Sequence, residues 1–401
     1  MAFGGRSSVL ITRCSVGLYR RHRLVLLPLL FPSEQARLDA CAAALLAAHH
    51  SPAALSEHRT EVQASAERFQ EMVKQLTKAP PEGSTNNHPA VAALQMVWPS
   101  LDTCLSAYAA SENMVEKLCR CYKLVIRAAG VHFAPSLQIM ATHLVEHFKQ
   151  SPQPAYLYTA SILITELGSS APEPLLQMLT SMSEAAFARL QSLEAFTAQP
   201  DMVEEYFFLV SRFLEYCPSL LLTSPLIAQV VQCGMVGLQI DHRAAHAGVS
   251  SCLYHLICAG TKPLKSAPRG SAPLPEHTAA VIELLRSVGG VMVGGIISGL
   301  ASERPVYGLE KEKSNPAAVL WQIAQLQPNG PQILSQLLGN ALTAVPTAVF
   351  SEEERGAWTG QLGTAITARN EGGFFDAIRD FNSACRRKHR AIARTQERAL
   401  N

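Results

Sequence analysis

The sequence predicts an all-α fold, a right-handed α-solenoid built from about seven HEAT-like helical hairpins. Apolar residues recur with the roughly 3.6-residue period of a helix from residue 33 onward. The helical runs come in consecutive pairs with a spacing of about 40 residues. Hydrophobic residues make up 48% of the chain and charged residues only 16%. A hairpin of this kind cannot bury its own apolar face, so neighbouring hairpins must stack into an elongated array.

Capping and breaking residues bound the predicted helices. Ser111 and Ser351 are expected N-caps, Pro172 lies in a first turn, Gly130 ends a helix, and Asp241 is the expected cap of the helix that follows it. The predicted helices span residues 33–50, 56–79, 89–109, 112–129, 133–150, 153–168, 172–195, 200–216, 223–240, 242–259, 275–301, 315–326, 329–345, 351–370 and 372–398. Nothing in the sequence predicts a strand.

Composition divides the chain into four parts. Residues 1–24 are an arginine-rich leader that we interpret as unrelated to the rest, although its composition is also typical of a mitochondrial transit peptide. Residues 25–260 hold HEAT-like repeats, and 261–275 form a flexible insertion rich in Pro and Gly. Residues 276–401 hold further repeats and a basic tail. The part that follows the leader is expected to be the middle of a larger protein.

Several functional classes are disfavoured by composition. The net charge of +2 does not predict a nucleic-acid-binding chain. The 10 cysteines contain no Cys-x-x-Cys pair, which favours buried thiols in a reducing compartment over disulfides or a zinc site. The longest apolar run, Val288 to Ala301, is shorter than the roughly 20 residues that span a membrane. Its two Gly-x-x-x-Gly pairs, which start at Gly290 and Gly295, predict close backbone packing instead.

The helix over 112–129 has one basic face. Projected at about 100° per residue, Lys117, Arg120, Lys123 and Arg127 fall within one third of the circumference, and Glu116 is the one acid on that arc. Like charges one turn apart are mildly destabilising. The stripe is therefore either a binding face for an acidic partner or a solvated surface of a scaffold.

A second motif suggests metal chemistry. His143-Leu-Val-Glu-His147 matches the His-x-x-Glu-His pattern of some zinc proteases and places both histidines on one helix face. Such a site also requires a third ligand and an open polar pocket. The downstream acids on helices are Glu204, Glu205 and Glu215, and no pattern singles one of them out. We therefore expect no metal, no cofactor and no enzymatic activity.

The last predicted helix combines an aromatic stripe with a basic cluster. Phe374, Phe375 and Phe381, together with Ile378, are expected to seal the final repeat. The basic cluster is interpreted as a solvated tail or a secondary binding contact, and it consists of Arg386, Arg387, Lys388 and Arg390.

Ordered motifs along the chain resemble the transportin-3/importin-13 branch of the importin-β superfamily. The motifs that carry the resemblance are His88-Pro89, Trp98-Pro99, the helix from Val115 to Arg127, Leu157-Tyr158 with Ser161, Asp241-His242-Arg243, and Ile378-Arg379-Asp380-Phe381. The resemblance implies a HEAT-repeat nuclear import receptor of the cytoplasm and nucleus, which carries protein cargo and releases it on binding Ran-GTP. It implies no direct contact with nucleic acid or membrane.

The resemblance also implies a role for the basic helix. By position, Lys117, Arg120, Lys123 and Arg127 correspond to the family's arginine-rich helix, which holds phosphorylated Arg/Ser-rich segments of splicing factors. Lysine stands at 117 and 123 where arginine is expected, so the two-pronged hydrogen bonding of a guanidinium to phosphate is lost there. The family's N-terminal repeats, which form the main surfaces for Ran and nucleoporins, have no counterpart in the sequence. The resemblance therefore implies that the chain corresponds to the C-terminal half of such a receptor behind an unrelated leader. A scaffold without transport activity is the alternative interpretation.

Overall fold

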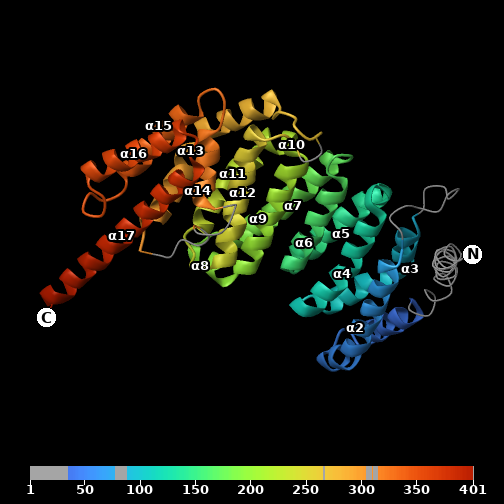
Figure 1. Cartoon of the computed structure of the whole chain (residues 1–401). Coiled ribbons are helices and arrows are strands. Elements are labelled where there is room, and N and C mark those ends of the chain that lie inside the picture. Colours follow the sequence, from blue (N-terminus) through green and yellow to red (C-terminus); the bar gives the residue numbers. More distant parts are fainter. Residues whose placement is uncertain (1–34, 77–87, 265–266, 304–308, 310–314, 401) are drawn as a thin grey trace, which may run out of the picture. The chain divides into compact units, whose positions relative to one another are not determined.

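The computed structural model describes residues 35–76, 88–264, 267–303, 309 and 315–400. Every regular element within these ranges is a helix (Figure 1). The leader predicted over residues 1–24 lies outside them. Contacts divide the chain into two compact units, Met1–Leu167 and Gly168–Asn401, a boundary that the sequence analysis did not draw.

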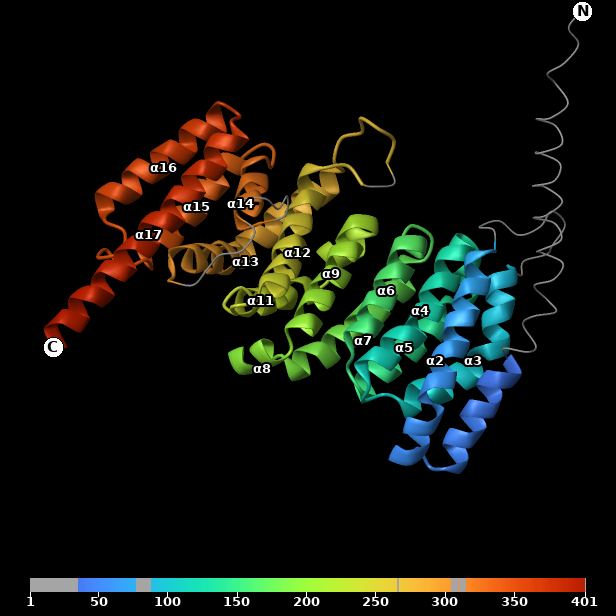
Figure 2. The ribbon, with the colours of Figure 1, turned by 60° about the horizontal axis from the view of Figure 1, so that its bottom comes forward.

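The first unit is a two-layered array of helices. After a helical segment over 35–47, its elements are α2 (Pro52–Lys74), α3 (Pro89–Ala107), α4 (Glu112–Ala129), the 3-10 helix η1 (Gly130–Ser136), α5 (Leu137–Gln150) and α6 (Pro154–Leu167). Helix α4 packs against α2 on one side and α6 on the other, while α3 contacts α4 from the second layer. Figure 2 shows α2, α4 and α6 in this unit from a second direction. Alternate helices therefore stack, as in a solenoid of hairpins.

The second unit repeats this arrangement. Its elements are α7 (Pro172–Arg189), α8 (Leu193–Ala198), α9 (Pro200–Tyr216), α10 (Pro218–Leu222), α11 (Leu226–Gly237), α12 (Arg243–Thr261), α13 (Pro275–Ala301), α14 (Pro316–Ala324), α15 (Gly330–Thr343), α16 (Glu352–Thr367) and α17 (Glu371–Leu400). One layer runs through α7, α9, α12, α14 and α17, and the other through α11, α13 and α15. The predicted class, an all-α solenoid, is confirmed.

Local sequence explains where many helices begin. Ser351 accepts a hydrogen bond from the amide of Glu354, whose carboxylate accepts one from the Ser351 amide, so the predicted cap is a complete capping box. The prediction for Asp241 is wrong. His242 is the N-cap of α12, and its ring nitrogen accepts a hydrogen bond from the amide of Ala245 at 3.4 Å.

The final repeat is closed as predicted. Phe374, Ile378 and Phe381 are fully or almost fully buried. The ring of Phe381 stacks on Trp358 with centroids 4.5 Å apart, and the Trp358 indole donates a hydrogen bond to the carbonyl of Ala377 at 2.8 Å. Burial of several aromatic side chains, each contributing roughly 1.5–3 kcal/mol, anchors α17 on α16.

Two helical stretches are long and apolar enough to cross a membrane by length and composition alone: Glu112–Gln150 and Pro275–Ala301. The second of these, α13, has 27 residues, so the helix extends well beyond the apolar run that the sequence analysis considered. In the structure α13 packs on α11, α12, α15 and α17, and the first stretch is broken by η1 between α4 and α5. Buried helices in the core of a helical array have the same length and apolar composition, so these two features alone do not indicate a membrane span.

The glycines of α13 only partly follow the prediction. A Cβ atom at Gly295 would overlap the sulfur of Met235, so this glycine permits close packing. A Cβ at Gly290, Gly294 or Gly299 would meet no described atom within 4 Å. The prediction of close backbone packing is therefore wrong for three of the four residues.

The cysteines behave as the composition predicted. Of those in the described part of the chain, each is a free thiol, and each is buried except Cys233, which is half-buried. Burial raises the pKa of Cys104 to about 12 because the thiolate would lose its hydration. These thiols pack as small apolar groups in the helix interfaces.

Candidate functional site

Helix α4 holds the four basic residues predicted to bind a partner. It begins after Ser111 and ends at Gly130, whose φ of 53° lies in the left-handed region that stops a helix. Its apolar side, which includes Leu118, Tyr122 and Ile126, is completely buried. This side is buried because α2 and α6 pack on the two flanks of α4 and α3 packs on it from the second layer. Only a narrow strip of α4 therefore remains in contact with solvent.

Lys117 lies at the edge of this strip and is already engaged. Its Nζ atom is 2.9 Å from a carboxylate oxygen of Glu67 on α2, and its side chain is 23% exposed. The hydrogen bond from Lys117 lowers the pKa of Glu67, with a smaller contribution from Gln63. Glu67 could not be predicted as this partner from the sequence, because it lies 50 residues away from Lys117.

Arg120 is exposed and turns back along its own helix. Its guanidinium donates a hydrogen bond of 2.7 Å to Glu116, and half of each side chain is exposed to solvent. Exposed pairs of this type contribute about 0.3–0.5 kcal/mol, so a stronger anion can displace Glu116. Arg120 also borders a depression between α2 and α4, whose lining mixes both signs of charge: Glu67, Arg68, Glu71 and Lys74.

The predicted exposure of Lys123 is wrong. The helical wheel placed it on the outer face, but its side chain is buried beneath α6 and only 8% exposed. Its Nζ atom lies 4.1 Å above the ring centre of Tyr158, a cation–π contact. Burial lowers the pKa of Lys123, and the charges of Arg120 and Arg127 act in the same direction.

Arg127 is exposed in the last turn of α4, where a positive charge is favoured by the helix dipole. It donates a long hydrogen bond of 3.4 Å to the hydroxyl of Tyr158 on α6. Tyr158 thus contacts both Lys123 and Arg127. Its motif, Leu157-Tyr158, was visible in the sequence, but nothing in the sequence placed it beside α4.

The four residues therefore do not form one continuous exposed stripe. Lys117 and Arg120 lie on the α2 side with Glu67 and Glu116 as partners. Lys123 and Arg127 meet at Tyr158 on the α6 side.

The C-terminal basic cluster is also divided. Lys388 bonds to Glu354 on α16 at 2.7 Å, and this bond lowers the pKa of Glu354. Arg386 is half-buried, whereas Arg387 and Arg390 are exposed. Of the four residues of the cluster, these last two offer the exposed basic surface.

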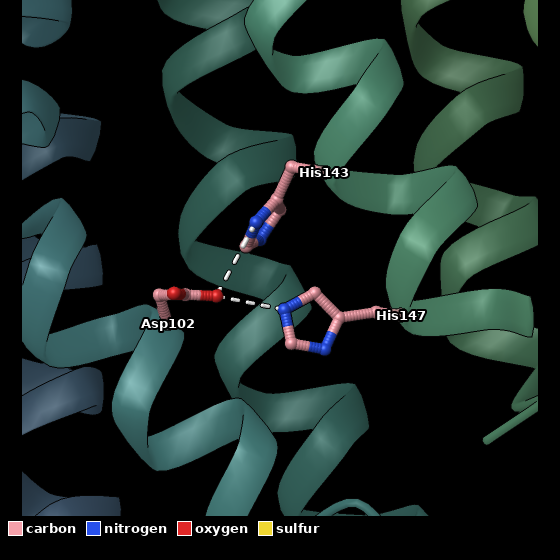
Figure 3. A group of neighbouring side chains, drawn as sticks. All are labelled: Asp102, His143 and His147. Carbon is pink, nitrogen blue, oxygen red and sulfur yellow. Dashed lines mark hydrogen bonds and ion pairs between the residues drawn. The ribbon is translucent and has the colours of Figure 1, made fainter. Parts of the chain in front are cut away.

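His143 and His147 lie beside an acid that the sequence analysis did not consider. Asp102 on α3 directs one carboxylate oxygen at both rings, 2.8 Å from His147 Nε2 and 3.4 Å from His143 Nδ1 (Figure 3). Glu204, Glu205 and Glu215 belong to the second unit. The acid was missed because it precedes the motif and comes from another helix.

Comparison with known families finds a match that covers the first unit from α3 onward and the start of the second. Residues 88–190 match the family model described as the Transportin-3/Importin-13 fourth TPR domain. Over this segment the chain is similar to the transportin-3/importin-13 branch. The transportin-3/importin-13 segment contains all of α4 together with Tyr158, Asp102, His143 and His147, whereas Glu67 and the basic cluster of α17 lie outside it.

A similarity to a named receptor agrees with this assignment. The chain is 33% identical over 165 residues to Transportin MOS14 of Arabidopsis thaliana. The match covers 40% of this chain and 17% of that protein's length.

Proposed function

We propose that this chain acts as a nuclear import receptor-like protein of transportin-3 type and that α4 binds phosphorylated Arg/Ser-rich cargo. One observation carries the proposal: the family match spans the whole of α4, and α4 exposes Arg120 and Arg127. The basic helix α4 therefore lies at the position to which the family resemblance assigns cargo binding.

The chemistry of the exposed arginines suits phosphoserine. A phosphate carries about −1.5 to −2 charges near neutral pH, and each charge-assisted hydrogen bond contributes roughly 1.5–3 kcal/mol. Arg120 and Arg127 each present a planar fork that matches two phosphate oxygens. Their present partners, Glu116 and the Tyr158 hydroxyl, form weaker contacts that a phosphate can replace.

The two lysines have different parts in this proposal. Lys117 contacts phosphate when it leaves Glu67, and as a point charge it adds attraction without two-pronged geometry. Lys123 is too buried for direct contact and adds positive potential behind Tyr158, which it holds against Arg127.

The partners of the whole receptor follow from the family. Protein cargo, Ran and nucleoporins are proposed partners, and passage between cytoplasm and nucleus is the proposed location. The matched family consists of transport receptors, so we propose no enzymatic activity. The exposed Arg387 and Arg390 of α17 are proposed secondary contacts for acidic cargo segments.

The direct test is a binding titration with a fluorescent Arg/Ser peptide, phosphorylated or not. The full chain is expected to bind the phosphorylated peptide, and the double variant Arg120→Glu, Arg127→Glu is expected to lose this binding. Arg286→Glu is the matched control, because Arg286 is an exposed arginine of α13 paired with Glu283. Equal affinity for both peptides would exclude phosphate recognition, and a fully active double variant would exclude α4.

A scaffold without transport activity is the second candidate. The ion pairs of Lys117 with Glu67 and of Arg120 with Glu116 favour it, because they neutralise half of the basic residues internally. The two functions differ in salt dependence. Binding through exposed arginines weakens steeply as salt shortens the Debye length from about 10 Å at 0.1 M, whereas an apolar scaffold contact does not.

A further inference from the structure

The group formed by Asp102, His143 and His147 is built from two helices of the first unit. Asp102 comes from α3, and the two histidines lie four residues apart on one face of α5. The three candidate ligand atoms lie within 4.8 Å of one another (Figure 3). Two imidazoles and a carboxylate are a common set of three protein ligands for zinc, with a fourth position left for water.

The two distances from Asp102 to the histidine nitrogens are close to those around a small transition-metal ion. Zinc bonds of about 2.0–2.1 Å in a tetrahedral site place neighbouring ligand atoms roughly 3.3 Å apart. Here Asp102 Oδ1 is 2.8 Å from His147 Nε2 and 3.4 Å from His143 Nδ1. Two nitrogen donors with one oxygen favour zinc or cobalt over calcium or magnesium, which prefer oxygen alone.

A second group of contacts orients the ligands. The Nε2 atom of His143 lies 3.2 Å from the hydroxyl of Tyr122 on α4, so this nitrogen has its own partner while Nδ1 faces Asp102. A metal-bound histidine usually donates its other N–H to such a group. The rings of Trp98 and Tyr156 pack against His143 and His147 and fix their planes.

The two histidines are buried, whereas Asp102 is partly exposed to solvent. Both imidazoles are buried, and desolvation lowers the pKa of His143 to about 4, so the neutral ring required of a metal ligand persists at neutral pH. Asp102 has a side chain that is 46% exposed. The cluster therefore has rigid, buried nitrogen donors and one side through which an ion and a water ligand reach it from solvent.

We propose that Asp102, His143 and His147 bind a zinc-class divalent ion that joins α3 to α5. Through Tyr122 the ion also fixes the inner side of α4. The proposed role is structural, because the ion would tie together two helices of one unit. In the absence of the ion, the His147 ring donates its Nε2–H to Asp102; on binding, this ring exchanges tautomer and Nε2 offers a lone pair instead.

The test titrates zinc alone into the metal-free full chain by calorimetry and repeats the titration with cobalt by absorption spectroscopy. The full chain is expected to bind one ion with micromolar or tighter affinity and to gain thermal stability on binding. Absence of binding at micromolar zinc overturns the proposal. A cobalt spectrum with thiolate charge-transfer bands also overturns it, because the ion would then lie on cysteine.

The variants separate ligation from folding. Asp102→Asn keeps a carbonyl oxygen that accepts the hydrogen bond of His147 and is expected to retain the fold while zinc affinity falls at least tenfold. His147→Gln is expected to lose binding as well. His58→Gln, on α2 in the same unit, is the matched control and is expected to bind like the unaltered chain. Unchanged affinity in both cluster variants, or equal loss in the control, overturns the assignment.

Discussion

Replacing Glu67 by Gln is expected to strengthen binding of the phosphorylated peptide. The change removes the carboxylate that holds Lys117 at 2.9 Å and leaves a neutral side chain of the same length. It also removes a negative charge from the depression bordered by Arg120. A substitution that improves binding is a stringent test, because damage to the fold cannot produce it.

The magnitude follows from the exposure of the pair. The Glu67 side chain is 53% exposed and that of Lys117 is 23% exposed, so the pair belongs to the class that contributes about 0.2–1 kcal/mol. Repulsion between a carboxylate and a phosphate in water adds about 1 kcal/mol per unit charge at 4 Å and less at greater distance. Together these effects favour the variant by about 1 kcal/mol, or roughly fivefold in Kd.

The assay is a titration of the phosphorylated peptide at low and high salt, with Glu71→Gln as the control. Glu71 lines the same depression but pairs with Lys74, away from the basic residues of α4. Tightening in the Glu67 variant alone supports direct use of Lys117. If both variants bind alike, Lys117 takes no part in phosphate recognition and only the overall charge of the surface matters.

Further predictions concern stability. Gly248→Ala is expected to lower the free energy of unfolding by about 2 kcal/mol or more, because the new Cβ would lie 2.8 Å from the backbone oxygen of Glu204 where α12 crosses α9. Gly290→Ala, with no described atom within 4 Å, is expected to raise it by up to about 1 kcal/mol in the same urea titration; equal effects would contradict the packing argument. Acidification is expected to destabilise the first unit through His143, whose pKa falls from 6.5 to about 4 on folding. The unfolded chain then binds the proton first, so this contribution is complete above pH 6.5 and decreases by about 2 kcal/mol between pH 7 and pH 5; a His143→Asn variant with the same pH slope would contradict it.

The helices could be predicted from the sequence because their determinants are local. Apolar periodicity, proline in first turns and polar caps placed α4, α9 and α13 with the bounds that the structure shows. The sequence did not reveal the 3-10 turn over Gly130–Ser136 or the short helix Leu193–Ala198. Each continues a neighbouring apolar pattern. The sequence predicted the end of α4 at Gly130, but it did not predict the 3-10 geometry that follows.

The candidate site was less predictable because burial depends on neighbouring helices. A helical wheel orders residues around one axis, but it does not contain α6, which covers Lys123. In the same way, the spacing of His143 and His147 was visible in the sequence, whereas Asp102 is brought to them by the packing of α3. Spacing within a helix is encoded locally, and partners across a helix interface are not.

The separation of the two exposed arginines bears on the form of the cargo. Arg120 and Arg127 are seven residues apart, which corresponds to about 10 Å along the helix axis at 1.5 Å per residue. Their contacts keep them separate, since Arg120 turns toward Glu116, one turn nearer the N-terminus, and Arg127 reaches across to Tyr158 on α6. In the proposed cargo-binding role, they would therefore form two phosphate sites instead of one clamp. A segment with repeated phosphoserines can occupy both sites at once and gain from the high effective concentration of the second phosphate, whereas a single phosphoserine can occupy only one.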